Sequence, residues 1–174
     1  SQAGSYQKDN AVLAIETCQK HFNQIKISDI QSGLKNWIWP ARMQLMEKDF
    51  FYDVAHNASA VDKLTTDLST IYSIKPIGLL VLKNDKITDS FLKILETQFE
   101  KLIISTIDSK DILQETDILS NPRLKKFEFI SNLNSALNQA KSMSHRGPKV
   151  VFGSHYIAKE VYKFFDFSFD NGTI

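Results

Sequence analysis

Strand-sized apolar runs alternate with helical patterns along most of the chain, and this alternation constrains the fold more than any other feature. The run from Pro76 to Leu82 is apolar throughout, as strands are when a parallel sheet is covered on both faces. The segment 87–99 that follows it is amphipathic, with apolar residues at helical spacing. Such repeated alternation predicts an α/β fold, a mostly parallel sheet with helices on both faces.

About six strands are expected in this sheet. They are predicted at 42–46, 50–53, 76–82, 101–105, 126–130 and 149–152. The first two are close enough to form a hairpin, which adds one antiparallel strand. Two helices are expected ahead of them, over about 4–21 and 27–34, and the second is predicted to end near Gly33. The remaining helices are predicted from Asn57, at 87–99, 111–119 and 132–143, and after Ser154.

Composition limits the class of protein. The 174 residues suit one domain, and a hydrophobic fraction of 43% is ample for a core. With 21 basic and 20 acidic residues the net charge is +1, which gives no electrostatic case for nucleic acid. No apolar run reaches membrane-spanning length. The single Cys18 fits a reducing compartment and is expected to be a plain core thiol. We therefore expect a cytoplasmic protein that binds neither nucleic acid nor membrane.

The stretch 39–57 has the pattern of a nucleotide or phosphate site. Three aromatic strand formers are followed at once by Asp53, His56 and Asn57, and a helical pattern begins there. Polar groups at the carboxyl end of a strand, just before a helix, are where open α/β sheets bind ligands. Asn57 or Ser59 can cap the helix, whose free N–H groups favour an anion.

Two motifs in this stretch together resemble the signature of a known family. They read Trp39-Pro40-Ala41-Arg42-Met43-Gln44 and Asp53-Val54-Ala55-His56-Asn57. In this order and spacing they resemble the C-terminal domain of folylpolyglutamate synthase / dihydrofolate synthase, in the Mur ligase superfamily, which has a Rossmann-like fold. The resemblance implies an ATP-dependent amide ligase that adds L-glutamate to folate, and in bifunctional members to dihydropteroate, through an acyl phosphate.

The resemblance also implies a domain organisation. Residues 1–36 are then the tail of a central domain with leading helices, 37–41 an interdomain hinge, and 42–174 the glutamate-ligase domain. The phosphate loop Gly-x-x-x-x-Gly-Lys-(Ser/Thr) is absent from the chain. In the family an N-terminal ATPase domain carries that loop, most folate contacts and the ligands of Mg²⁺. We therefore expect a monomeric C-terminal piece that is inactive without this partner domain.

Five residues receive roles from the resemblance. Asn10, Arg42 and Asp53 are expected to contact ATP: Arg42 by neutralising phosphoryl charge and Asp53 by accepting hydrogen bonds from the ribose hydroxyls. His56 is the expected catalytic residue, which positions the incoming glutamate or the anionic intermediate. Ser154, in a strand–glycine–hydroxyl–helix pattern, is expected to reach the glutamate as well.

Each of these residues also has a structural interpretation. Asn10 and Ser154 can be helix N-caps, and Asp53 a cap or a hydrogen-bonded core carboxylate. Arg42 can be a solvated or ion-paired surface arginine, and a lone histidine such as His56 is more often structural than catalytic. For the whole chain, the alternative is a stand-alone Rossmann-like module that binds a nucleotide or a partner and catalyses nothing.

The chain departs from the family pattern at two places. The family's Gly-x-His-Gln-x-x-Asn segment has Tyr6 in place of the histidine, while Gln7 and Asn10 remain. After the strand at 76–82 the family has Lys-Asp-Lys-Asp, whereas this chain has Lys83-Asn84-Asp85-Lys86. The motif lysine therefore aligns with Asp85, and either Lys83 or Lys86 could replace it. No second ligand stands at metal-binding spacing from His56, so a zinc site is not expected.

Overall fold

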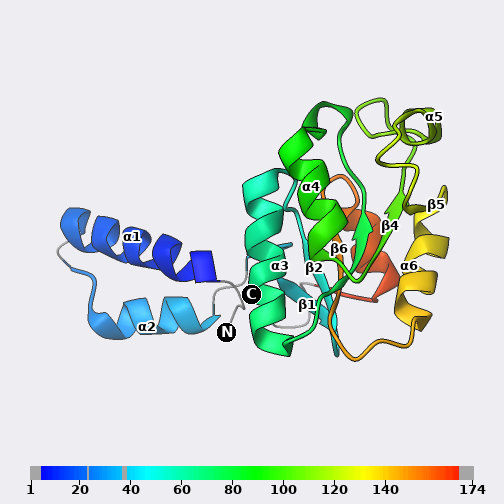
Figure 1. Ribbon diagram of the computed structural model, residues 1–174. Coiled ribbons are helices and arrows are strands. Elements are labelled where there is room, and N and C mark those ends of the chain that lie inside the picture. Colours follow the sequence, from blue (N-terminus) through cyan, green and yellow to red (C-terminus); the bar gives the residue numbers. More distant parts are fainter. Residues whose placement is uncertain (1–4, 23, 37–38, 169–174) are drawn as a thin grey trace.

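The computed structural model contains a six-stranded sheet covered by helices, with a pair of helices standing beside it (Figure 1). The structure describes residues 5–22, 24–36 and 39–168. The strand order is β1-β2-β6-β3-β4-β5. Strand β1 is antiparallel to β2, and the other neighbours are parallel. The predicted fold class, a mostly parallel α/β sheet with one antiparallel strand, is confirmed.

All six expected strands form, although several are shorter than predicted. Their bounds are β1 Gln44–Glu47, β2 Phe50–Asp53, β3 Ile77–Leu80, β4 Lys101–Ser105, β5 Glu128–Ile130 and β6 Lys149–Phe152. The predicted hairpin is present, with Gln44 opposite Tyr52 and a register shift between Leu45 and Glu47. Strand β6 runs parallel between β2 and β3, so that Asp53 lies opposite Phe152 at the carboxyl ends.

The helices follow the predicted order, with corrections to the bounds of three of them; the helix predicted after Ser154 begins only at Ala158. Their bounds are α1 Ser5–His21, α2 Ile27–Asn36, α3 Ala58–Tyr72, the 3₁₀ turn η1 Asn84–Lys86, α4 Asp89–Gln98, α5 Glu115–Ser120, α6 Leu133–Ser142 and α7 Ala158–Phe164. Helix α2 does not end near Gly33 but continues to Asn36. Helix α5 begins four residues later than its predicted start at 111, because the Gln114 amide donates to the carbonyls of Ile107, Ser109 and Ile112 and organises these residues as a loop.

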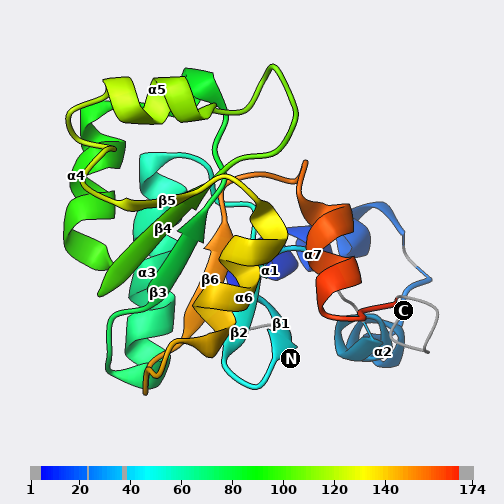
Figure 2. The same ribbon diagram turned by 90° about the vertical axis from the view of Figure 1, so that its right-hand side faces the viewer.

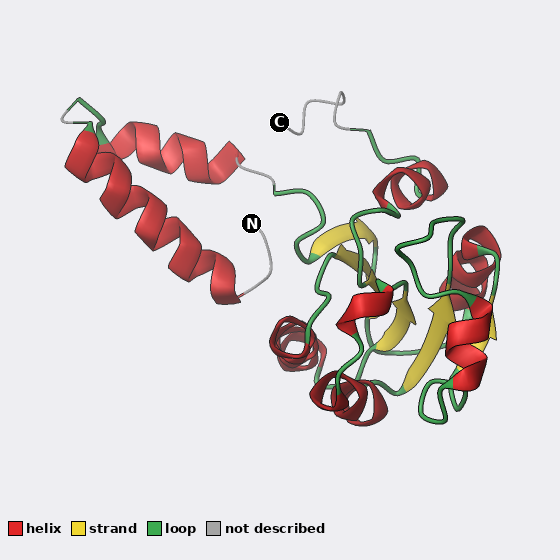
Figure 3. Ribbon diagram, turned by 90° about the horizontal axis from the view of Figure 1, so that it is seen from above, coloured by secondary structure: helices red, strands yellow, loops and turns green. Residues whose placement is uncertain are grey.

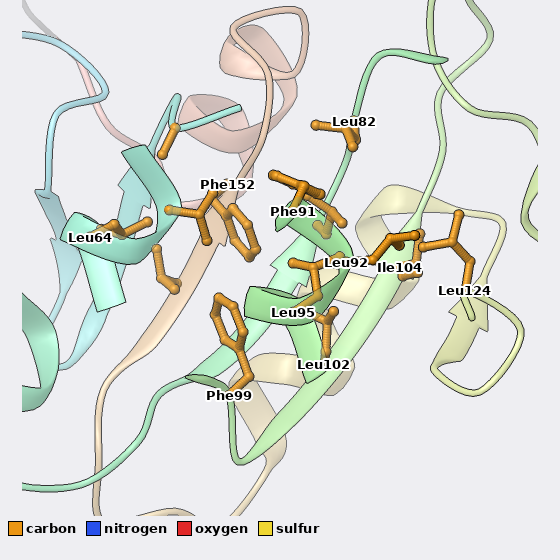
Figure 4. Packing of buried hydrophobic residues seen from close by; sticks show 14 of the residues in the cluster. Leu64, Leu82, Phe91, Leu92, Leu95, Phe99, Leu102, Ile104, Leu124 and Phe152 are labelled. Atoms are coloured by element: carbon orange, nitrogen blue, oxygen red, sulfur yellow. The ribbon is translucent and has the colours of Figure 1, made fainter. Parts of the chain in front are cut away.

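Two hydrophobic clusters cover the two faces of the sheet. Because side chains alternate along a strand, Phe51, Leu80 and Phe152 belong to the cluster under α3 and α4. Figure 4 shows part of this cluster, with Phe152 facing Phe91 and Phe99. Their sequence neighbours Tyr52 and Leu79 belong to the cluster under α6 and α7, the helices nearest the viewer in Figure 2. The buried runs that the sequence indicated are therefore central strands with both faces covered.

The helices that follow β2 and β3 cover one face of the sheet, but the helix that follows β6, the strand between them, covers the other face. Helices α3 and α4 thus pack on the first face, and α7 packs on the second. A reversal of this kind opens a crevice at the carboxyl ends of the strands, where doubly wound sheets bind ligands. The carboxyl ends of β2 and β6 are thus the place to look for a site.

Helices α1 and α2 form a hairpin that extends away from the sheet (Figure 3). Several members of its apolar pattern are exposed, among them Val12 at 53%, Leu13 at 66% and Phe22 at 60%. Cys18 was expected in a core, but it is only partly buried and lines an apolar cavity of about 450 Å³ between the two helices. A hairpin of two helices has too few neighbours to enclose its thiol.

The predicted hinge 37–41 falls partly on residues 37 and 38, which lie outside the described residues. Within its described part, Trp39 is 49% exposed whereas Ala41 is buried. The division into a central-domain tail, a hinge and a ligase domain remains a prediction.

Candidate functional site

The loop that leads into β1 presents Arg42 on a strained backbone. Ala41 has φ 55° and Met43 has φ 43°, in the left-handed region that residues with a Cβ seldom adopt. Two side chains hold this conformation, since the Ala41 N–H donates to Gln44 Oε1 (2.8 Å) and the Met43 N–H donates to Asp53 Oδ2 (2.7 Å). Strain of this kind persists only where the surroundings determine it, and it clusters at functional sites.

Asp53 ends β2 as a buried carboxylate, 2% exposed. Its Oδ2 accepts from Met43 as described, and its Oδ1 accepts from the Ala55 N–H at 2.7 Å. These two donors occupy two of the roughly four lone-pair sites of a carboxylate. The structural interpretation of Asp53 as a hydrogen-bonded core aspartate is therefore correct, and the same residue also forms part of a cavity wall.

A cavity of about 590 Å³ lies between the helical hairpin and the β2–α3 segment. Arg42 and Asp53 line it from the sheet side, and Gln7 and Asn10 line it from α1. Its volume is in the range of small-molecule sites. The three residues assigned to ATP by the resemblance, Asn10, Arg42 and Asp53, thus surround one space although they are far apart in sequence.

The cavity is suited to an anion with polar substituents. The start of α3 contributes to its wall, where Asn57 caps the helix by accepting from the Ala60 N–H at 2.9 Å. A helix N-terminus favours negative charge, and Lys63 adds a second cation to the wall alongside Arg42. Within the described part of the chain, no hydrogen bond or ion pair engages the half-buried Arg42 guanidinium.

Gln7 adds an unusual feature to the α1 side of the cavity. It is only 5% exposed, and its Oε1 has no hydrogen-bond partner among the described residues. A buried acceptor without a donor is costly, so a ligand that brings a hydroxyl or amino group to this wall would relieve that cost. Asn10 beside it is exposed on the helix surface and lies well inside α1, which begins at Ser5, so the N-cap interpretation of Asn10 is wrong.

Ser154 lies at the same sheet edge as Asp53 but does not line this cavity. It is 4% exposed; its Oγ accepts from the Tyr156 N–H (3.1 Å) and its carbonyl accepts from the Tyr52 hydroxyl (2.9 Å). The N-cap interpretation of Ser154 is wrong, because Ile157 precedes the first residue of α7. Gly153 before it has φ 112°, and an added Cβ would lie 2.3 Å from the Val81 carbonyl oxygen, so this turn requires glycine.

His56 is exposed, close to the cavity in sequence but not in its wall. Its Nδ1 lies 2.8 Å from the Val54 carbonyl oxygen. Because a carbonyl only accepts, this contact places the proton of the neutral ring on Nδ1 and leaves Nε2 as the acceptor. The structure therefore brings Asn10, Arg42 and Asp53 together around one cavity. His56 and Ser154 lie outside its wall, after the carboxyl ends of β2 and β6.

The two lysines that could replace the family's loop lysine differ in their surroundings. Lys86 pairs with the neighbouring Asp85 at 2.9 Å. The Nζ of Lys83 lies 5.8 Å from the centre of the Tyr156 ring, two residues after Ser154. Lys83 is thus the lysine that the fold brings close to the Ser154 loop.

Sequence reasoning missed Lys63, and it gave Gln7 no role of its own. The spacing offered a signal for Lys63, because it follows Ser59 by four residues and Ala60 by three, which places these residues on one helix face. Among the described residues, no three His, Cys, Asp or Glu side chains are grouped as a metal site. Within the same part of the chain, no helix combines the length and the apolar character needed to span a membrane.

Comparison with known proteins identifies the fold. No protein-family profile matches the chain, and no curated protein sequence matches it. Among solved structures, Mycobacterium tuberculosis folylpolyglutamate synthase complexed with ADP and AMPPCP superposes with a TM-score of 0.81 at 24% identity, over 96% of this chain and 41% of that chain. E. coli FolC in complex with DHPP and ADP superposes with a TM-score of 0.78 at 19% identity, over 90% of this chain and 38% of that chain.

A third similar structure is the bifunctional folylpolyglutamate synthase/dihydrofolate synthase of Yersinia pestis, complexed with AMPPNP and Mn ion. Its TM-score is 0.70 at 20% identity, over 82% of this chain and 36% of that chain. The resemblance inferred from the two motifs is thus confirmed at the level of the fold. The chain spans less than half the length of each of these enzymes, a share that fits one domain.

Proposed function

We propose that this chain is the C-terminal domain of an ATP-dependent ligase of the folylpolyglutamate synthase type, which adds L-glutamate to folate. The convergence of Asn10, Arg42 and Asp53 on one cavity carries this proposal. The three come from segments that the motif resemblance assigns to ATP, and proteins of the same fold have been solved with ADP or ATP analogues.

In this proposal, different residues of the chain contact different parts of the nucleotide. The Arg42 guanidinium, with a planar fork of donors, neutralises phosphate charge, and the start of α3 with Lys63 adds to the positive potential. Asp53 accepts hydrogen bonds from the ribose hydroxyls, and its orientation is fixed by the N–H groups of Met43 and Ala55. Asn10 contacts the nucleotide from the other side of the cavity.

The chemistry itself proceeds through an acyl phosphate. The γ-phosphoryl group of ATP passes to a carboxylate of the folate, which releases ADP; the amine of L-glutamate then attacks the acyl carbon and expels phosphate. His56 is assigned to position the incoming glutamate or the anionic intermediate, and Nε2, the acceptor nitrogen of its neutral ring, suits the glutamate amino group, which donates. Ser154 binds the glutamate at the neighbouring strand end. Closure of this domain onto an ATPase domain excludes water from the acyl phosphate.

Mg²⁺ accompanies the nucleotide in this proposal. Asp53 is the carboxylate that lines the cavity, and both of its oxygens accept from backbone N–H groups. This chain therefore has few groups that could coordinate Mg²⁺, and we assign the ligands of the ion mainly to the N-terminal domain of a longer protein. When bound there, the ion would supply positive charge that neutralises the phosphates.

The test is a ligation assay on a longer protein that contains both this chain and a phosphate-loop domain. We expect ADP formation that requires both L-glutamate and a folate acceptor, and no ligation by the 174-residue chain alone, which lacks the phosphate loop. Folate and dihydropteroate are tested side by side, because only the acceptor range separates a monofunctional from a bifunctional enzyme. Absence of glutamate-dependent ADP formation with every pterin acceptor would overturn the ligase and leave a nucleotide-binding module.

A further inference from the structure

The loop that presents Arg42 is held at an energetic cost. Ala41 and Met43, on either side of the arginine, both have left-handed backbone angles, and neither is a glycine. Asp53 holds one side of the loop through the Met43 N–H. The other side depends on a different contact, which connects the loop to α7.

That contact is made by Gln44, which is buried at 7% exposure. Its Oε1 accepts from the Ala41 N–H and from the Tyr162 hydroxyl, both at 2.8 Å. Because a backbone N–H only donates, the amide oxygen must face Ala41, and Nε2 must face the other way. Nε2 is then left buried and without a partner among the described residues.

An unpaired buried donor reduces stability, so the arrangement is not explained by stability. An apolar side chain at position 44 would remove the unpaired donor, but it would also release Ala41. What the glutamine amide provides is a fixed position for Ala41 and, through it, for Arg42. Strained backbone and unpaired polar groups that persist together are a reason to look for function.

Tyr162 supplies the second donor from α7. Its ring packs edge-on against Tyr52, with centroids 5.7 Å apart. Burial raises the pKa of Tyr162 to about 12, against an opposing effect of the Ala41 backbone. Its hydroxyl therefore keeps its proton, and remains a donor to Gln44, throughout the neutral pH range.

We propose that Gln44 and Tyr162 are positioning residues that hold Arg42 at the nucleotide phosphates. The inference rests on the proposed function, because it requires Arg42 to meet a nucleotide. Gln44 fixes the residue before the arginine, and Tyr162 fixes the Gln44 amide. A segment after β6 thereby controls the geometry of a loop before β1, more than a hundred residues earlier in the chain.

Two substitutions test this role. Gln44→Met keeps the length of the side chain and removes the acceptor, and Tyr162→Phe keeps the ring and removes only the hydroxyl. Tyr52→Phe is the matched control, because it removes a buried hydroxyl from the adjacent ring, and that hydroxyl bonds to the Ser154 carbonyl instead of the Arg42 loop. The measurements are amide hydrogen exchange by NMR and titration of the chain with ADP and Mg²⁺.

We expect the Ala41 amide to exchange at least about tenfold faster in Gln44→Met and about threefold faster in Tyr162→Phe. ADP affinity should fall by similar factors. Tyr52→Phe should lower global stability but leave ADP affinity within about twofold of that of the unaltered chain. Tyr162→Phe keeps the test decisive even if Gln44→Met fails to fold.

The outcomes separate this inference from the proposed function. If the unaltered chain binds ADP and both variants bind it equally well, Gln44 and Tyr162 have no positioning role, while the nucleotide site remains. If Tyr52→Phe weakens ADP binding as much as Tyr162→Phe does, the effect is general destabilisation, and the positioning role is overturned. If the unaltered chain does not bind ADP at millimolar concentration, the proposed nucleotide site is overturned, and this inference with it.

Discussion

The two walls of the candidate cavity are built in contrasting ways. On the sheet side, Arg42 and Asp53 belong to a loop and a strand end fixed by hydrogen bonds and backed by two closed hydrophobic clusters. On the other side, Gln7 and Asn10 belong to α1, part of the helical hairpin that extends away from the sheet (Figures 1 and 3). This hairpin carries exposed apolar side chains. The chemistry we assign to the sheet wall is thus pre-organised by packing, whereas the hairpin wall rests on few internal contacts.

This difference shows what an amphipathic pattern can and cannot indicate. The same periodicity predicted α1 and α4, and both helices form. The apolar face of α4 is buried in the core, whereas Leu13 on α1 is 66% exposed. Periodicity therefore predicts that a helix has an apolar face, but it does not predict what covers that face.

The largest expected effect is on chemistry and comes from the sheet wall. In the longer ligase that we propose, Arg42→Ala should lower turnover by roughly 10³-fold or more, as loss of a transition-state arginine does. The melting temperature of the 174-residue chain should barely change, because no described residue pairs with the guanidinium. Arg42→Lys should restore little, since it keeps the charge but loses the bidentate fork. Marked destabilisation with near-normal turnover would make Arg42 structural.

The next prediction compares the packing of the two regions directly. Phe91→Ala removes a fully buried ring under the sheet and should lower the free energy of unfolding by about 3–5 kcal/mol. Leu13→Ala on the hairpin should change it by about 0.5 kcal/mol or less, because the side chain is mostly exposed. Urea unfolding of the chain measures both. Equal losses would show that the hairpin is as tightly packed as the sheet, and the contrast between the walls would fail.

Substitutions of Asp53 and Asn10 compare the stability contributions of the two cavity walls. Asp53→Ala leaves the Met43 and Ala55 N–H groups without an acceptor and should lower the free energy of unfolding by about 3 kcal/mol. Asn10→Ala, at an exposed position, should change it by about 0.5 kcal/mol or less. Asp53→Asn keeps one acceptor oxygen and serves as the intermediate control. Unfolding by urea distinguishes the cases, and an Asp53→Ala chain as stable as Asn10→Ala would contradict the anchoring role.

The smallest effect concerns charge away from both walls. Glu96 is hydrogen-bonded by Arg123 and Lys126, and the Arg123 contact, followed by that of Lys126, lowers its pKa from 4.5 to about 2. Because the pKa of Glu96 is lower in the folded state, Glu96 stabilises the fold at pH values above its pKa in the unfolded chain. This contribution is lost as pH falls from 4.5 toward 2. In Glu96→Gln the free energy of unfolding should therefore fall less steeply with decreasing pH below 4.5. The difference should be modest, because the group is exposed to solvent. Identical acid unfolding curves for the variant and the unaltered chain would refute this prediction.

The sequence predicted the sheet well, for a physical reason. Central parallel strands are buried on both faces, so their apolar runs stand out, and Lys101–Ser105 and Lys149–Phe152 have the predicted bounds. The start of α5 was missed because a single amide, that of Gln114, satisfies three carbonyls of the preceding loop. No periodic pattern records a contact of that kind.

The site was predictable where it depends on a strand end and not where it depends on distant contacts. Asp53 was found because a carboxylate after a buried strand indicates a ligand or a hydrogen bond, and it has the hydrogen bonds. The contact between Gln44 and Tyr162 joins residues 118 positions apart, and no local spacing could reveal it. Ser154 shares the predicted sheet edge, but strand register alone could not show that the cavity lies on the α1 side instead.

An NMR titration of the isotopically labelled chain with ADP and Mg²⁺ tests directly whether this cavity binds a nucleotide. We expect saturable shift changes centred on the amides of Asn10, Arg42, Asp53 and the first turn of α3, the residues around the cavity. Both walls should respond in one binding event, since the proposed nucleotide would span the space between them. Absence of saturable shifts, or shifts confined to the apolar cavity between α1 and α2, would contradict it.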